Sequence, residues 1–148
     1  MTRRHYSTET PWETFVGYSR AVKAGNQIFV SGTTASDIDG SAVCVQDAAG
    51  QTRFILMKIE SALVALGASL NDVVRTRMFV VDINQWEKIG AVHREFLADV
   101  CPAATMVEVS RLTHPDHLVE IEVDAFLDGD LAISGCCHSS GVRCVAVR

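Results

Sequence analysis

The chain has 148 residues, of which 48% are hydrophobic and 21% charged, and its formal net charge is −5 at pH 7. This length predicts one globular domain with a substantial core, and the negative charge argues against a nucleic-acid partner. No apolar run approaches the roughly 20 residues of a membrane-spanning helix, and five cysteines without a signal sequence favour reduced thiols, so we expect a cytoplasmic protein with no membrane contact.

The first half of the chain predicts an arm, a hairpin and a helix. Residues 1–16 show no periodic pattern and predict an irregular N-terminal arm. Two short strands, 18–23 and 27–31, flank a turn at Ala24-Gly25-Asn26. Apolar residues recur at helical spacing between Asp47 and Leu66, and Gly67 follows where a helix cap is expected.

The second half predicts a strand, a helix and two further strands. The β-branched run 73–81 predicts a central strand, and an amphipathic helix follows that Pro102 ends. Strands are expected within 102–112 and 118–126. This order predicts an α+β fold in which two helices cover one face of a sheet. Residues 129–148 have no clear period and predict a C-terminal tail outside the folded domain, 17–128.

Alternation in the last strand separates an apolar face from a charged one. Val119, Ile121 and Val123 alternate with Glu120 and Glu122. If the helices cover the apolar face, the other face exposes a mixture of charged and large apolar side chains. These are Arg75, Arg77, Phe79, Met106, Glu108, Glu120, Glu122, Asp124 and Phe126. Such a mixture favours an oligomer interface or a binding wall, and the alternative is a face whose charges keep the domain soluble.

Glu120 is the strongest candidate for acid–base chemistry. A carboxylate on a strand whose opposite face is core can have apolar neighbours, which raise its pKa. The alternative is that the carboxylates of this face are structural charges paired with Arg75 and Arg77. Tyr18 is equally open, either as a hydrogen-bonding phenol in a site or as an ordinary strand residue.

Metal binding is not expected. The tail carries four possible ligands, which lack zinc-knuckle spacing: Cys136, Cys137, His138 and Cys144. His93 lies on the apolar side of the second helix and predicts a core or interface residue. His114 and His117 flank a turn and are expected to face solvent. No phosphate-binding glycine loop or serine nucleophile motif occurs.

Five segments in order resemble the RidA/YjgF family. They are Gly17-Tyr18-Ser19, 25–32, 72–80, 102–109 and 119–122. The resemblance runs from about residue 17 to residue 126 and implies a chorismate-mutase-like α+β fold. It further implies a homotrimer with ligand clefts between subunits, which hydrolyses reactive enamines and imines without a metal or organic cofactor.

The resemblance places Tyr18, Ser31, Gly32 and Glu120 in the cleft, with Glu120 holding or activating water. Deaminating members have, at the position of Ala104, an arginine that grips the substrate carboxylate through two hydrogen bonds. A methyl group cannot do this.

Met106 stands in place of a family cysteine and makes the cleft more apolar. Arg77, on the charged sheet face, could supply the missing charge.

Two functions therefore remain open. The first is a RidA-like hydrolase or deaminase that acts on a small reactive imine, enamine or related metabolite. The alternative is a non-catalytic trimeric module that binds a small molecule or a partner protein, which the loss of the arginine at Ala104 motivates. Ribonuclease activity, sometimes attributed to the family, is disfavoured by the acidic charge balance.

Overall fold

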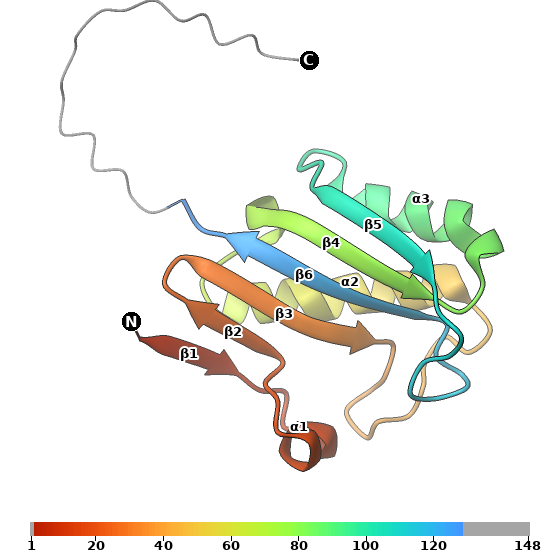
Figure 1. Ribbon diagram of the computed structural model, residues 1–148, viewed down its shortest axis with the longest axis horizontal. Coiled ribbons are helices and arrows are strands. Elements are labelled where there is room, and N and C mark those ends of the chain that lie inside the picture. The colour runs from red at the N-terminus through yellow and green to blue at the C-terminus, as the bar shows by residue number, and fades with distance from the viewer. Residues whose placement is uncertain (1, 129–148) are drawn as a thin grey trace, which may run out of the picture.

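A six-stranded sheet covered on one face by two helices forms the domain. The computed structural model describes residues 2–128, so the predicted tail lies outside the described residues. The elements are β1 (Arg3–Tyr6), α1 (Pro11–Val16), β2 (Ala21–Ala24), β3 (Gln27–Thr34), α2 (Ala48–Ala65), η1 (Leu70–Asp72), β4 (Val73–Val80), η2 (Ile83–Gln85), α3 (Trp86–Leu97), β5 (Ala103–Glu108) and β6 (Val119–Phe126). Helices α2 and α3 pack together behind one face of the sheet (Figure 1). The predicted α+β architecture is confirmed.

The strand order is β1-β2-β3-β6-β4-β5. Neighbouring strands are antiparallel except β4 and β5, which are parallel because α3 carries the chain back across the sheet. Strand β5 therefore ends the sheet on one side. Its outer edge has no strand partner within residues 2–128.

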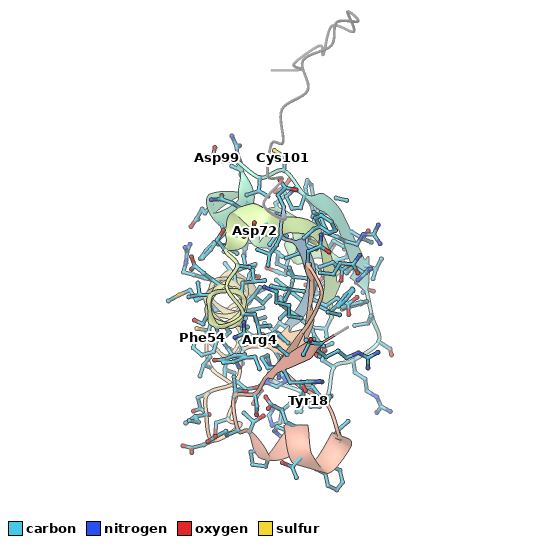
Figure 2. All side chains as sticks on the ribbon, turned by 90° about the vertical axis from the view of Figure 1, so that its left-hand side faces the viewer. Arg4, Tyr18, Phe54, Asp72, Asp99 and Cys101 are labelled. Carbon is cyan, nitrogen blue, oxygen red and sulfur yellow. The ribbon has the colours of Figure 1, made fainter. Side chains whose placement is uncertain are left out.

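The core lies between α2 and the sheet, as the apolar pattern predicts. Ile55, Ile59 and Leu63 of α2 are fully buried, as is Ile121 of β6. The helix begins after Asp47, whose side chain accepts a hydrogen bond from the Gly50 backbone N–H. Figure 2 shows the sheet edge-on, with α2 at the labelled Phe54 on one side.

The prediction of an irregular N-terminal arm is wrong for residues 3–16. Strand β1 pairs with β2, and the short helix α1 follows. The arm is held by Glu13, which is only 5% exposed and accepts hydrogen bonds from Ser7 Oγ, Thr8 Oγ1 and the Thr8 backbone N–H. Burial raises the pKa of Glu13, but these hydrogen bonds together bring it below its usual value. Because hydrogen bonds to Glu13 hold the arm, its sequence shows no apolar periodicity, and the ordered structure of the arm could not be predicted from such a pattern.

A β-bulge interrupts the pairing of β3 with β6. Val30 pairs with Val123, but the next pair is Thr33 with Ile121. Two residues of β3, Ser31 and Gly32, therefore lie opposite a single residue of β6. Bulges redirect side chains locally and increase strand twist. This one brings the backbone of Gly32 next to the side chain of Glu120.

Candidate functional site

The face of the sheet away from the helices carries a network of paired charges. The Arg77 guanidinium of β4 donates to Glu122 Oε1 at 2.7 Å and to Asp124 Oδ2 at 3.2 Å. Each of the three side chains is between 27% and 34% exposed, so water still screens the network. Arg77 shares this face with Glu120, as predicted, but two carboxylates already hold its charge.

Glu120 lies directly on the backbone of Gly32. A Cβ atom at Gly32 would be 2.1 Å from Glu120 Oε1, so any side chain there would displace the carboxylate. Burial raises the pKa of Glu120 above its usual value; Arg20 acts in the opposite direction, and Glu122 raises the pKa further. A carboxyl group in this state is suited to proton transfer nearer neutral pH than an exposed glutamate would be.

Arg20 connects Tyr18 with Gly32 and is the residue that the sequence analysis missed. Its NH1 donates to the Gly32 carbonyl at 2.9 Å and to Thr33 Oγ1 at 3.0 Å, and its NH2 donates to Tyr18 Oη at 2.9 Å. The residue is 7% exposed. Figure 2 shows Tyr18 near α1 at one end of the sheet. The sequence offered one signal for Arg20. It lies two positions after Tyr18 in an extended segment, and such residues point to the same side of the chain.

Ser31 is engaged within the hairpin. Its Oγ donates to the Ser19 backbone carbonyl at 2.8 Å, across the β2–β3 pair. The structure thus groups Tyr18, Gly32 and Glu120 around Arg20, while the Ser31 hydroxyl already has a backbone partner.

Ala104 and Met106 lie on the other face of the sheet from Glu120. In the parallel β4–β5 register, Ala104 pairs with Thr76 and Met106 with Met78, and both β4 residues are buried on the helix side. The expectation that Met106 and Glu108 share the charged face is therefore wrong. Alternation along β5 could not predict which side chains lie on which face, because both sets contain polar and apolar residues. The register with β4 determines the orientation of this edge strand.

His93 of α3 reaches the sheet beside this edge. Its Nε2 lies 3.0 Å from Thr76 Oγ1, next to Ala104 in the register. Burial lowers the pKa of His93. The side chain is half-buried in a single protomer, between the core and the unpaired edge.

His117 is buried, so the expectation that it faces solvent is wrong. It is 5% exposed, and its Nε2 hydrogen-bonds with Ser36 Oγ at 2.9 Å. The reason is Gln51 of α2, whose side-chain amide donates to the Asp116 carbonyl and accepts from the Leu118 backbone N–H, each at 2.7 Å. These bonds hold the 114–118 turn against the helix. His114, by contrast, has an exposed side chain.

A hollow of about 420 Å³ lies between the N-terminal arm and α2, bordered by Thr10, Ser36, Phe54 and Lys58 among others. Lys58 Nζ donates to the Ser36 carbonyl at 2.7 Å, and burial lowers the pKa of Lys58. Its ammonium group thus supports the loop after β3. The predicted site residues do not border this hollow.

In the part of the chain that the structure describes, no three His, Cys, Asp or Glu residues gather closely enough to hold a metal ion. The candidate ligands in the tail, from Cys136 to Cys144, lie outside the described residues. Among residues 2–128, no helix has both the length and the apolar character needed to cross a membrane.

This is a small α+β protein with a compact polar site, as the sheet order, the two helices on one face and the Glu120 group define it. Comparisons with known proteins specify its family. A family model described as Endoribonuclease L-PSP matches residues 8–127. The chain is 39% identical over 109 residues to a RutC family protein of Pyrococcus horikoshii, which covers 74% of this chain and 86% of that protein. It is 38% identical over 104 residues to the 3-aminoacrylate deaminase RutC of Acinetobacter baylyi, which covers 70% of this chain and 82% of that protein.

A solved structure agrees. Rv2704 of Mycobacterium tuberculosis, described as a member of the YjgF/YER057c/UK114 family, superposes with a TM-score of 0.78 at 44% identity, over 85% of this chain and all of that one. The chain belongs to the Endoribonuclease L-PSP family, which is the RidA/YjgF family that the five sequence segments resemble.

Proposed function

We propose that this protein hydrolyses a small reactive imine or enamine to a carbonyl compound and ammonia, with Glu120 and Tyr18 as catalytic residues. The observation that carries the proposal is the Glu120 carboxyl group, which is half-buried, has a raised pKa and lies against Gly32 beside the Arg20–Tyr18 pair. The 38% identity to a protein named 3-aminoacrylate deaminase supports it, because 3-aminoacrylate is an enamine.

The proposed reaction uses only proton transfers and water. The protonated Glu120 carboxyl group donates its proton to the enamine carbon, which gives the iminium ion. Glu120, now a carboxylate, accepts a proton from water while the water oxygen bonds to the iminium carbon, and the carbinolamine forms. Glu120 returns this proton to the carbinolamine nitrogen and takes up the hydroxyl proton as the C–N bond breaks, so that ammonia leaves, the carbonyl forms and the carboxyl group is restored. Tyr18 can donate its O–H to the substrate in these steps, and no metal or organic cofactor enters the reaction as written.

The proposal includes a homotrimer whose clefts lie between copies. Ala104 and Met106, which the family resemblance assigns to the cleft, face the helix side at the sheet edge, whereas Glu120 faces the open side. One protomer therefore does not supply both groups to one site, but two neighbouring copies can. Phe29, Val107 and Phe126 are more than a third exposed, which also favours a covered surface. We place this assembly in the cytoplasm.

Ala104 bears on the substrate class. A carboxylate needs a charged or strongly hydrogen-bonding partner, and an alanine methyl offers none. Arg77 has its guanidinium on Glu122 and Asp124, so it offers a ligand less charge than an unpaired arginine. We therefore propose a substrate whose group near Ala104 and Met106 is uncharged or apolar.

The test is ammonia release from a panel of imines generated in situ by an amino-acid oxidase or an amine oxidase, so that substrates with and without a carboxylate are compared. We expect the wild type to accelerate release from the uncharged imines. Glu120→Gln keeps the shape and removes the base, and should lower the rate about 100-fold or more. Equal rates for wild type and Glu120→Gln on every substrate would refute the enzymatic function.

The alternative is a non-catalytic trimer that binds a small molecule or a partner protein, which the alanine at position 104 favours. It predicts ligand-dependent rises in melting temperature without turnover over the same panel. The family description also names an endoribonuclease. RNA cleavage that Glu120→Gln abolishes would support that activity in place of imine hydrolysis.

A further inference from the structure

Arg20 is a buried cation that contacts Tyr18 directly and also contacts Gly32, the residue against which Glu120 packs. A buried arginine is costly unless its donors are paired, and two of its nitrogens donate to three acceptors, Tyr18 Oη, the Gly32 carbonyl and Thr33 Oγ1. The third, Nε, lies 3.9 Å from Glu13 Oε1 and makes no hydrogen bond. A purely structural arginine would be expected to pair closely with the buried Glu13. Here the guanidinium fork is instead directed at the Tyr18 and Gly32 side.

The contact with Tyr18 fixes the direction of a proton. A guanidinium has only donors, so Tyr18 Oη accepts the hydrogen bond from NH2. The phenol's own hydrogen then points elsewhere and is available to a ligand. The Arg20 Cζ atom also lies 5.4 Å from the centroid of the Tyr18 ring, which restrains the ring. Arg20 thus orients Tyr18 as a donor.

The contact with Gly32 fixes the charge next to Glu120. NH1 holds the Gly32 carbonyl, and Gly32 is the residue against which the Glu120 carboxylate packs. Two charges act on Glu120. One is Arg20, the residue before β2, and the other is Glu122 on β6 itself, which is paired with Arg77 of β4. Arg20 favours the ionised carboxylate, whereas burial and Glu122 disfavour it.

We propose that Arg20 is a positioning residue of the imine-hydrolysing site, which turns the Tyr18 hydroxyl toward the substrate and keeps the Glu120 carboxylate available as a base. This inference rests on the proposed function, but its central contact can be tested without turnover.

The first experiment is an NMR titration of the Glu120 side-chain carboxyl carbon in protein labelled with ¹³C-glutamate, assigned with Glu120→Gln. In Arg20→Gln, the titration midpoint should move to higher pH than in the wild type. Arg53→Gln is the matched control, because Arg53 is an exposed arginine paired with Glu95 on the helix side, and it should leave the midpoint unchanged. An unchanged midpoint in folded Arg20→Gln would overturn the inference.

Arg20→Lys serves where Arg20→Gln does not fold, as judged by circular dichroism. It keeps the charge but not the fork, so the Glu120 midpoint should stay near that of the wild type while kcat falls about tenfold or more through loss of the Tyr18 contact. A Glu120 midpoint that moves to higher pH than in the wild type, or an unchanged kcat, would count against the proposed role.

A double-mutant cycle with Tyr18→Phe tests the coupling in the imine assay. The double variant Arg20→Gln/Tyr18→Phe should be only slightly slower than Arg20→Gln. Without Arg20 the Tyr18 hydroxyl is no longer oriented, so its removal has little further effect. Fully additive losses would contradict the orienting role. If the wild type turns over no imine, the proposed function fails, yet the NMR titration still decides whether Arg20 controls Glu120.

Discussion

The two faces of the sheet differ in how strongly the chain specifies them. On the helix side, Ile121 and Val123 are at most 1% exposed and lie in a continuous apolar core. On the open side, their neighbours Glu122 and Asp124 are about one-third and one-quarter exposed and pair with one arginine. The same strand thus contributes to stability through one face and offers chemistry through the other.

The two faces differ in how freely their residues can change during evolution of function. The apolar face is constrained by close packing, in which a single methylene matters. In a single copy, the charged network on the open face is partly exposed and contributes little to stability, so its charges can change with the ligand. Glu120 lies between these extremes, because it is on the open side and yet half-buried against Gly32.

The largest expected effect comes from breaking the helix side. Ile121→Ala should lower the free energy of unfolding by about 2–5 kcal/mol, because it removes buried methyl groups and leaves a cavity. The matched control is the next residue, Glu122→Gln, which should cost less than about 1 kcal/mol. Urea denaturation measures both. A loss at Glu122 as large as that at Ile121 would remove the distinction between the faces.

A smaller effect should follow from restoring an anchor at the sheet edge. We expect Ala104→Arg to increase activity on 2-aminoacrylate about tenfold or more, because a guanidinium can bind its carboxylate through two hydrogen bonds. Ala103→Arg places the same side chain one residue away on the opposite face and should give no gain. No gain from Ala104→Arg in a folded, assembled protein would mean that the pocket has diverged at further positions.

The pH dependence of stability sharpens the position of Glu120. Its pKa is raised in the folded state above the usual value of a glutamate, chiefly by burial. The folded protein therefore binds this proton more tightly than the unfolded chain. The resulting stability is present below the unfolded pKa and is lost as pH rises through the folded pKa.

Glu120→Gln removes this dependence. The free energy of unfolding of the variant relative to the wild type should therefore rise as pH increases above about 4.5. Urea denaturation of both proteins over this range gives the difference. A difference that is constant with pH would show that Glu120 is not desolvated.

The smallest effect is expected at Arg77. Arg77→Met should change the free energy of unfolding by less than about 1 kcal/mol, because its ion pairs are partly exposed. In the wild type the guanidinium is paired with two carboxylates and does not bind the ligand, so the variant should change KM less than about threefold. A threefold change corresponds to a binding free energy of under about 1 kcal/mol. Steady-state kinetics on uncharged imines tests this, and a large rise in KM would instead make Arg77 the ligand-binding cation.

Most of the fold was predictable, because α2 and β6 carry regular apolar periods that match their burial. Other features depend on contacts between distant segments, and no local pattern reports these. The arm is held by Glu13, the burial of His117 is imposed by Gln51, and the orientation of Met106 follows from its pairing with Met78.

The candidate site shows the same limit. Glu120 and Tyr18 could be proposed from residue type and family resemblance, but the structure was needed to find Arg20 between them. A single arginine at the start of a strand has no sequence pattern that separates a buried position from an exposed one. In the fold it is buried and donates a hydrogen bond to the carbonyl of Gly32, which lies in the bulge of β3.

The most direct measurement mixes two inactive copies. Glu120→Gln removes the base, and Ala104→Trp blocks the edge half of the cleft without touching Glu120. After the two are unfolded and refolded together, random cyclic trimers should recover about a quarter of the wild-type sites, each built from one intact half of each copy. Recovered ammonia release at that level, with sedimentation at the mass of three chains, is the predicted result. No recovery, or sedimentation as a single chain, would contradict a site shared between copies.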